Sequence, residues 1–484
     1  MSSSENKKSA FGGFLSYFYG NFVVLLLGFV QTPLVTRIMS TDEYGRTGMF
    51  EKAVSIIYIF AVLGMDQAYI RYYYKEDVNR RALMRSCLMP SLGIVSVLLV
   101  FYFIFSARVN EYLFEKNGTD IIILVAAYTL VSVFERFLFL DVRMQQNGVL
   151  YSNINITQKI LNIAFIFAAW YFLGDDFRVV LYAMTLSWGL TTLYLCIRYL
   201  IRLRDPKLSE KDGKTVYPRS ELIKYGTPFI LVLLMEWLLS SCDMIALKQW
   251  SDYSEIGVYE AAMKIMVILL TFKNSFIAFW SPVAMKKYEQ ESREDSTAFF
   301  RNAFDTIRFL SVIAAIGLMI FRRVVVLLLG ESYRGADKII PFLTLMPIFA
   351  MMFEVTVQGI KFVKKNMLLN IASAASIAVN IIGNVLLVPR LAGIGAAITT
   401  GLSYFIYFVA GSYISEKSWK VGYDYKRTFI DSLILVFMAS LAAFSDKFLM
   451  SVAAGIVMIA VVFIVERKTV IYIFKTISER MKGG

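Results

Sequence analysis

The sequence predicts an all-α polytopic membrane protein with about 14 transmembrane helices, and three observations predict this fold class. Hydrophobic residues make up 57% of the 484-residue chain, and the mean hydropathy is +0.59. Soluble globular domains are only about 45–50% apolar. The apolar runs are ~20 residues long, which is the length a helix needs to cross a hydrocarbon layer of ~30 Å. These runs are continuous rather than alternating, which favours helices over a β-barrel.

The apolar runs and the charges between them define the order of the spans. We expect spans near 14–36, 47–70, 87–107, 120–140, 155–173, 179–201, 222–247, 257–281, 303–321, 338–360, 367–388, 394–415, 428–444 and 449–465. Alternate connections, together with both termini, hold roughly three times as many Lys and Arg residues as the other connections. Basic connections remain in the cytoplasm. The pattern therefore predicts an even number of spans with both termini cytoplasmic.

Two segments indicate an internal repeat. Aligning Arg37–Val54 with Gln249–Met266 places Glu43 on Glu255, Gly45 on Gly257 and Lys52 on Lys264. A weaker match relates residues 147–162 to residues 366–380. Six spans separate the two copies of the first segment, so both copies begin on the same side of the membrane. The sequence therefore predicts two parallel repeats related by an axis along the membrane normal.

The repeat divides the chain into a predicted two-lobed, V-shaped bundle. We expect an N-terminal six-helix lobe at 1–201, a cytoplasmic linker at 202–221, a C-terminal six-helix lobe at 222–415, and two additional helices with a basic cytoplasmic tail at 416–484. The tail is amphipathic, which is typical of a segment lying on the inner leaflet.

Composition excludes several classes of function. The chain has no His, so His-based catalysis and His metal sites are excluded, and its three Cys lack disulfide or metal spacing. It contains no phosphate-binding Gly-rich loop. The net charge of +13 lies in short connections, which argues against a nucleic-acid partner. We therefore predict a transporter with no catalytic residue, metal or cofactor.

Cations inside apolar helices are the first candidate site residues. Such groups are costly in lipid and usually face protein or a wet cavity. Paired lysines suit a diphosphate, so Lys52 and Lys264 are predicted substrate ligands, with Arg37 and Lys273 as further candidates. The alternatives are snorkelling to the interface, a local pair between Glu260 and Lys264, and an interhelical pair for Lys273.

Acidic side chains in spans are the second set. Glu236, Ser240 and Asp243 share one face of a predicted helix, and Glu354 lies on another. Such groups could bind Na⁺ or hold a proton, or instead pair with a basic residue of a neighbouring span. A stripe containing Asn380 and Asn384 is more typical of close helix packing.

Four motifs carry a resemblance to a known family. The chain resembles the polysaccharide-biosynthesis flippases of the multidrug/oligosaccharidyl-lipid/polysaccharide exporter superfamily, in Asp243 with Gly257–Lys264 (GVYEAAMK), Arg37–Gly45 (RIMSTDEYG), Gly330–Asp337 (GESYRGAD) and Asn380–Ser403 (NIIGNVLLVPRLAGIGAAITTGLS). The resemblance covers the whole chain in order. It implies two six-helix lobes around a central cavity, plus two extra helices.

The resemblance also implies a function. It predicts alternating-access transfer of an undecaprenyl-diphosphate-linked oligosaccharide (an O-antigen, capsule or exopolysaccharide repeat unit) from the inner to the outer leaflet of a bacterial plasma membrane. Coupling to H⁺ or Na⁺ and contact with polysaccharide assembly proteins are part of this expectation. The family's cavity cations carry over only to Lys52, Lys264 and Arg37. The alternatives are a multidrug/cation antiporter on the same fold and a polytopic polymerase or glycosyltransferase of the same pathway.

Overall fold

A computed structural model describes residues 3–204, 213–363, 365–445 and 447–482, so part of the predicted linker at 202–221 lies outside the described residues. Throughout the described residues the regular elements are helices, with one isolated β-bridge between Val78 and Thr215. The all-α fold class is thereby confirmed. The chain divides into two compact units, Met1–Ser240 (unit 1) and Ser241–Gly484 (unit 2). The predicted six-helix lobes with a boundary at 202–221 stay a prediction.

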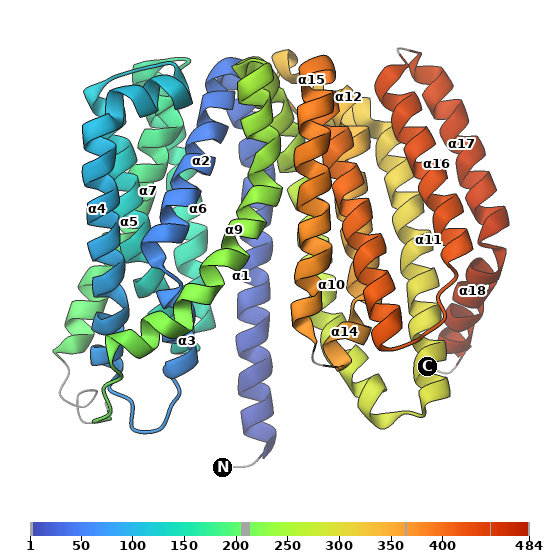
Figure 1. The fold of residues 1–484 in the computed structure, drawn as a ribbon, viewed down its shortest axis with the longest axis horizontal. Helices are drawn as coiled ribbons and strands as arrows, with labels where there is room; N and C mark the ends of the chain where they lie inside the picture. Colours follow the sequence, from blue (N-terminus) through green and yellow to red (C-terminus); the bar gives the residue numbers. More distant parts are fainter. Residues whose placement is uncertain (1–2, 205–212, 364, 446, 483–484) are drawn as a thin grey trace. The chain divides into compact units, whose positions relative to one another are not determined.

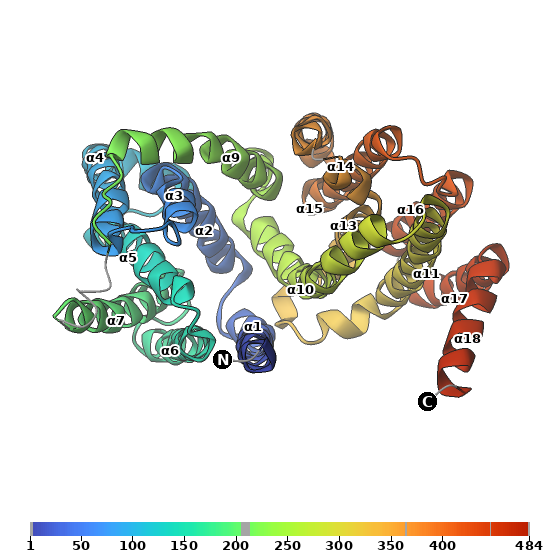
Figure 2. The same cartoon turned by 90° about the horizontal axis from the view of Figure 1, so that it is seen from below.

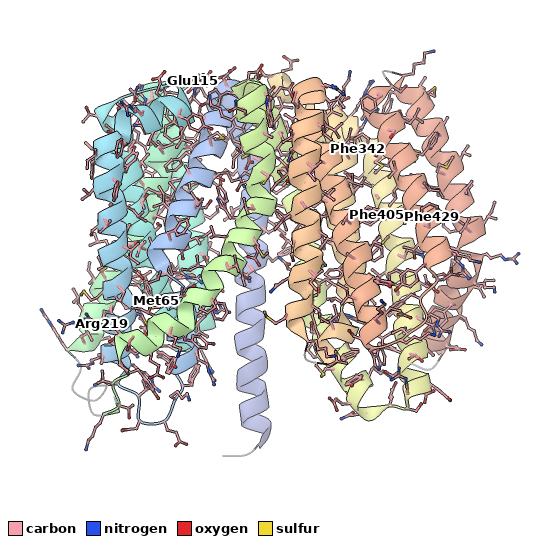
Figure 3. All side chains as sticks on the ribbon, in the orientation of Figure 1. Met65, Glu115, Arg219, Phe342, Phe405 and Phe429 are labelled. Atoms are coloured by element: carbon pink, nitrogen blue, oxygen red, sulfur yellow. The ribbon has the colours of Figure 1, made fainter. Side chains whose placement is uncertain are left out.

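Unit 1 is a bundle of long helices with one broken member. Its helices are α1 (Ser3–Ile38), α2 (Thr41–Val62), α3 (Met65–Tyr72), α4 (Arg80–Phe114), α5 (Thr119–Met144), α6 (Gly148–Leu173), α7 (Arg178–Leu203) and the first part of α9 (Arg219–Trp250). Figure 2 shows unit 1 nearly end-on, with α5 between the α6–α7 pair and the α2–α3 segment. Side chains cover the bundle from Glu115 at one end to Met65 and Arg219 at the other (Figure 3).

The predicted span 47–70 is broken in the structure. Leu63 and Gly64 have φ values of 54° and 67°, and α2 and α3 meet at a bend of 51°. Gly64 lies directly against the backbone of Gly226 in α9, where a Cβ on Gly64 would lie 2.1 Å from the Gly226 carbonyl oxygen. Two glycines therefore allow the break and the close approach of α9 to it.

Unit 2 is also helical, and its long α15 segment (Leu369–Ser418) folds back on itself at a kink. After the end of α9 its elements are α10 (Tyr253–Gln290), α11 (Arg293–Val326), η1 (Glu331–Tyr333), α12 (Ala336–Leu343), α13 (Leu345–Thr356), α14 (Gln358–Phe362), η2 (Asn366–Leu368), α15 (Leu369–Ser418), α16 (Tyr425–Phe444), α17 (Phe448–Val465) and α18 (Arg467–Lys482). The α15 segment is not straight, because Ala392 is non-helical with φ 45° and ψ −126°. The chain folds back there into two arms (Figure 1), and Ser376 on the first arm donates to the carbonyl of Ser403 on the second at 2.8 Å.

The number of spans depends on how the broken helices are counted. Twelve described helices are long and apolar enough to cross a membrane, or 13 if α2 and α3 form one span. The α15 segment counts once in these totals although it folds back at Ala392. A multi-pass membrane protein is thereby supported, while the number of 14 spans stays a prediction.

One hydrogen bond recurs at equivalent places in the two units. In unit 1, Glu43 near the start of α2 accepts from the backbone N–H of Phe177 at 2.8 Å, at the corner between α6 and α7. In unit 2, Glu255 near the start of α10 accepts from the backbone N–H of Gly393 at 3.1 Å, at the corner of α15. These are the two glutamates that the sequence repeat aligns. The same contact therefore fixes the same helical corner in both copies.

The C-terminal helices are held to unit 2 by a buried charge cluster. The guanidinium of Arg308 on α11 lies 3.0 Å from Asp431 on α16 and 2.6 Å from Glu466, which joins α17 to α18. All three residues are almost fully buried. The cluster also includes Asp305, 3.0 Å from Arg308, and Arg427, 3.8 Å from Glu466. Burying ion pairs is unfavourable unless the geometry is good, so this cluster specifies where α16–α18 attach.

Candidate functional site

A second buried polar centre of unit 2 surrounds Asp243 near the end of α9. Its Oδ2 accepts hydrogen bonds from the hydroxyls of Tyr259 (2.6 Å) and Thr400. Its Oδ1 accepts from the side-chain amides of Asn380 (3.1 Å) and Asn384 (2.8 Å). All five residues are buried. The carboxylate is thus held by four donors in an otherwise apolar bundle.

The helices of unit 2 position these donors. Asn380 and Asn384 lie one turn apart on the first arm of α15, so they face the same neighbour. Thr400 lies on the second arm and reaches the same carboxylate because α15 folds back at Ala392. Tyr259 enters from α10. Three helical segments therefore supply donors to a charge that a fourth segment, α9, carries.

Unit 1 contains a neutral version of this contact. The alignment that places Lys52 on Lys264 also places Gln31 on Asp243. The Gln31 amide donates to Asn162 at 3.0 Å, and the Asn162 amide donates to Ser187 at 3.4 Å. Asn162 is the residue that the second sequence match aligns with Asn380. The repeat therefore builds a three-helix polar contact twice, but only unit 2 places a carboxylate in it.

The donor set of the Asp243 centre suits a hard monovalent cation or a proton. Carboxylate, amide and hydroxyl oxygens are hard ligands, whereas thiolate and imidazole ligands are absent from the centre. The Oδ1 atom of Asn384 is buried and has no hydrogen-bond partner within the part of the chain that the structure describes. Within the described residues no group of three or more His, Cys, Asp or Glu could hold a metal ion. The centre therefore presents one negative charge to N–H and O–H donors, with the Oδ1 atom of Asn384 as a neutral oxygen beside it.

Comparisons with known proteins identify the family. A model of the family described as "Polysaccharide biosynthesis protein" matches residues 11–288 of the chain. The chain belongs to this family. As a member of the polysaccharide biosynthesis protein family, it is similar to the probable low-salt glycan biosynthesis flippase Agl15 of Haloferax volcanii, with 18% identity over 85% of each chain. It is also similar to the uncharacterized membrane protein MJ1068 of Methanocaldococcus jannaschii, with 22% identity over 80% of this chain and 81% of the other.

Solved structures share the fold of this family member. The lipid II flippase MurJ in an inward closed conformation aligns with a TM-score of 0.65 at 14% identity, covering 94% of this chain and 99% of the other. An inward-facing multidrug resistance MATE family transporter of the MOP superfamily aligns with a TM-score of 0.58 at 19% identity, covering 81% and 95%. Both likenesses extend over most of the chain.

The predicted acidic stripe on α9 does not form one site. Asp243 is buried in its own centre, whereas Glu236 and Ser240 are exposed, and the Ser240 hydroxyl donates to the carbonyl of Trp237 at 3.0 Å. Glu354 on α13 lies 3.9 Å from the ammonium of Lys273 and 3.6 Å from that of Lys361. This is the salt-bridge alternative for Glu354 and the interhelical alternative for Lys273.

The predicted cations differ in their surroundings. Lys264 lies 2.9 Å from Glu260, one turn earlier on α10, as in the local alternative. Arg37 is exposed in the last turn of α1. Lys52 is half-buried, and no ion pair reaches its ammonium from the residues that the structure describes. Its carbonyl accepts from the indole N–H of Trp237 at 3.1 Å, which ties α2 to α9.

Sequence reasoning missed most partners of Asp243. Tyr259 and Thr400 each lie inside a motif of the family resemblance, and the sequence singles out neither as a ligand. Asn380 and Asn384 were interpreted as packing residues. The spacing of these two amides, four residues apart in an apolar run, was the available signal. That spacing can be interpreted as a binding arrangement only once the two amides are seen to donate to Asp243 on α9, which lies far away in the sequence.

Proposed function

We propose that this protein is a flippase that moves a diphosphate-linked lipid oligosaccharide, with undecaprenol as the lipid, from the inner to the outer leaflet of a bacterial plasma membrane. The family match over residues 11–288 is the observation that carries the proposal. The similarity to a relative named as a probable glycan biosynthesis flippase supports the same substrate class. The charge bias of the connections supports cytoplasmic termini.

The cargo poses a physical problem that this chain can solve without a reaction. A sugar–diphosphate head cannot enter hydrocarbon, because each buried charge costs many kcal/mol. Its lipid tail can stay in the bilayer while the head passes through a wet protein interior. Lys52 supplies a half-buried ammonium for the diphosphate, and we assign Arg37 and Lys264 supporting roles.

Coupling to an ion belongs to the Asp243 centre in this proposal. A cation or proton taken up there neutralises a buried charge held by helices α9, α10 and α15. Release of that ion leaves the carboxylate to its four donors alone. The two states differ in how tightly these helices are held, which is the differential interaction that a coupled transporter needs.

The test is transfer of a fluorescent lipid-diphosphate-linked oligosaccharide between leaflets of proteoliposomes. We expect wild-type protein to move it, Lys52→Glu to reduce the rate at least tenfold, and Lys365→Glu, at an exposed cytoplasmic position, to have no effect. The proposal is wrong if wild-type protein moves none of this lipid, or if it exports organic cations and tolerates Lys52→Glu. Hydrolysis or elongation of the lipid-linked sugar would instead indicate an enzyme of the pathway.

The Asp243 assignment has a separate readout. Purified wild-type protein should gain up to about 2.7 kcal/mol of stability when the coupling cation reaches a hundredfold its Kd. The Asp243→Asn variant should gain none. Titrations with Na⁺ at fixed pH and with pH at fixed Na⁺ distinguish the two ions. Ser187→Ala, in the neutral contact of unit 1, is the matched control and should keep the wild-type ion dependence.

A further inference from the structure

Unit 1 contains a cavity that the proposed ion and diphosphate sites do not use. Its volume is about 530 Å³, within the range of small-molecule sites. It lies between α2, α5, α6 and α7. Its lining combines carboxylates, amides and aromatic rings, among them Glu51, Tyr128, Glu135, Asn155, Gln158 and Trp188.

Aromatic rings form one part of the lining. Tyr128 on α5 and Trp188 on α7 meet edge-to-face, with ring centroids 5.7 Å apart. Tyr128 is also packed against Phe50 at 5.5 Å, which fixes its ring. Rings held in this way offer large apolar surfaces at little cost in conformational entropy.

Oriented polar groups form the other part. The side-chain amide of Gln158 donates to Oε1 of Glu135 at 2.5 Å and to the hydroxyl of Thr191 at 3.1 Å. The carboxylate of Glu135 is therefore positioned by α6 and α7. The carboxylate also accepts a side-chain hydrogen bond from Trp188, and the lone pairs that these two bonds leave can accept from a ligand.

Arg136 brings donors to the same lining. Its guanidinium donates to Asp66 through Nε at 3.1 Å and through a second nitrogen at 2.5 Å. Asp66 lies next to the bend between α2 and α3 and is buried. The ion pair neutralises the guanidinium charge, and its remaining N–H groups can donate to a ligand.

This combination matches the chemistry of a sugar ring. A pyranose has an apolar C–H face, which packs on aromatic rings, and neighbouring hydroxyls, which pair with carboxylate, amide and guanidinium groups. Two carboxylates, those of Glu51 and Glu135, line the cavity beside one guanidinium, that of Arg136, which pairs with Asp66. A sugar carboxylate would meet like charges there and be disfavoured.

We propose that this cavity is a glycan subsite, which holds one or two neutral or amino-sugar residues of the cargo and disfavours uronic acids. The proposal rests on the flippase function proposed above. The position of the cavity near the proposed diphosphate ligand supports this assignment. Glu51 lines the cavity, and Lys52 follows it directly on α2. The Ser55 hydroxyl, also in the lining, donates to the Lys52 carbonyl at 2.8 Å. Lys52 is not part of the lining, but it lies within one helical turn of Glu51 and Ser55, so sugars attached to a diphosphate at Lys52 would be within reach of the cavity.

Direct binding of soluble sugars tests the proposal. The probes are N,N′-diacetylchitobiose, cellobiose and digalacturonate, with full-length protein in nanodiscs and ligand-observed NMR as the measurement. We expect wild-type protein to bind at least one neutral disaccharide and not the digalacturonate. Trp188→Leu should weaken the neutral sugar at least tenfold. Trp170→Leu, at an exposed tryptophan of α6 outside the cavity lining, should leave it unchanged.

A second variant guards against a simple loss of structure. Glu135→Gln keeps the shape of the side chain and removes a charge, so it should gain measurable digalacturonate binding. The subsite is wrong if no probe binds, if Trp188→Leu and Glu135→Gln bind as wild type does, or if tetraphenylphosphonium occupies the cavity and sugars do not displace it.

Transport measurements distinguish failure of the glycan subsite from failure of the flippase function on which it rests. If wild-type protein moves lipid-linked glycans and Trp188→Leu moves neutral and acidic glycans with unchanged preference, the subsite is wrong and the flippase function stands. If wild-type protein moves no lipid-linked glycan, the function itself fails.

Discussion

A single charge distinguishes two residues that the repeat places at equivalent positions. Gln31 and Asp243 each contact an asparagine of a neighbouring helix. The amide nitrogen of Gln31 donates to Asn162, while its Oε1 atom is buried with no hydrogen-bond partner among the described residues. A carboxylate in such a place needs donors or a cation, because a bare buried charge is far more costly than a bare amide. The four donors at Asp243 meet that requirement.

A prediction at the scale of single residues concerns Asp176, in the connection between α6 and α7. Burial alone raises the pKa of this carboxyl, but hydrogen bonds from Arg178 and the nearby charge of Lys116 outweigh it and hold the pKa below its ordinary value. A lowered pKa in the folded state stabilises the protein above the unfolded pKa of about 3.9. That contribution is lost as the pH falls through the folded pKa.

The Asp176→Asn variant should therefore be less stable than wild type near neutral pH and should approach it in acid. Thermal unfolding midpoints in detergent between about pH 6 and pH 3 would measure this difference. A constant difference across that range would contradict the argument. Asp175→Asn is a neighbouring control, since its carboxylate accepts from the Ser40 backbone N–H at 2.9 Å in an exposed contact.

The partners of buried charged residues cannot be predicted from the sequence alone. A charged residue in an apolar run is visible in the sequence, as Arg136 and Asp243 are. Its partner is not visible, because Asp66 precedes Arg136 by 70 positions and Thr400 follows Asp243 by 157. Helical periodicity relates residues three or four apart, whereas these partners are selected by the packing of whole helices.

At the scale of elements, helices follow from local apolarity but their breaks do not. The expected span 47–70 appears as α2 and α3, and the expected span 338–360 as α12, α13 and α14. Leu63 is an ordinary helix former, and it adopts a positive φ only because the bend and α9 require it. A long apolar run therefore predicts that the chain crosses the membrane, not that it crosses as one straight helix.

The contact between the α2–α3 break and α9 gives an element-scale prediction. A Cβ on Gly226 would lie 2.6 Å from the carbonyl oxygen of Gly64, and neither backbone can move away without displacing a helix. Gly226→Ala should therefore cost about 1–3 kcal/mol, as overpacking usually does. Thermal unfolding in detergent measures the loss.

The matched control is Gly189→Ala on α7, where a Cβ would meet no atom within 4 Å. Alanine is the better helix former, so this variant should be neutral or more stable by up to about 1 kcal/mol. Equal destabilisation by both substitutions would show that the close approach of the two backbones is not what matters.

The attachment of α16–α18 gives another prediction at this scale. Arg308→Ala leaves Asp431 as a buried anion without its ion pair and leaves Glu466 with Arg427, 3.8 Å away, which should cost about 3–5 kcal/mol. Because this cluster joins α11 to the C-terminal helices, cleavage by protease between α15 and α16 should become faster. Arg323→Ala removes a half-exposed pair with Asp337 at 3.4 Å and should change stability by less than about 1 kcal/mol. Unchanged protease resistance in the Arg308 variant would contradict this role.

At the scale of the whole molecule, the sequence indicates the repeat because local motifs preserve it. The sequence does not indicate that the polar centres of the two units differ. The glutamates at 43 and 255 keep the same backbone contact in both units. The residues around the polar centre have diverged. The position of Tyr259 is taken by Thr47, which donates to the carbonyl of Glu43 at 3.1 Å, and the position of Asn384 is taken by Ile166.

This asymmetry predicts that the charge cannot be moved between units. The double variant Gln31→Asp with Asp243→Gln keeps the net charge and places the carboxylate beside Asn162 and Ser187. There it lacks the donors that Tyr259 and Asn384 provide in unit 2, so it should be destabilised by about 3–5 kcal/mol, as expected for an uncompensated buried charge. Stability and lipid transfer of the double variant should both show no dependence on the coupling ion. Recovery of wild-type ion dependence would mean that any carboxylate in either polar contact suffices, and that the hydroxyl and amide donors of unit 2 do not select the site.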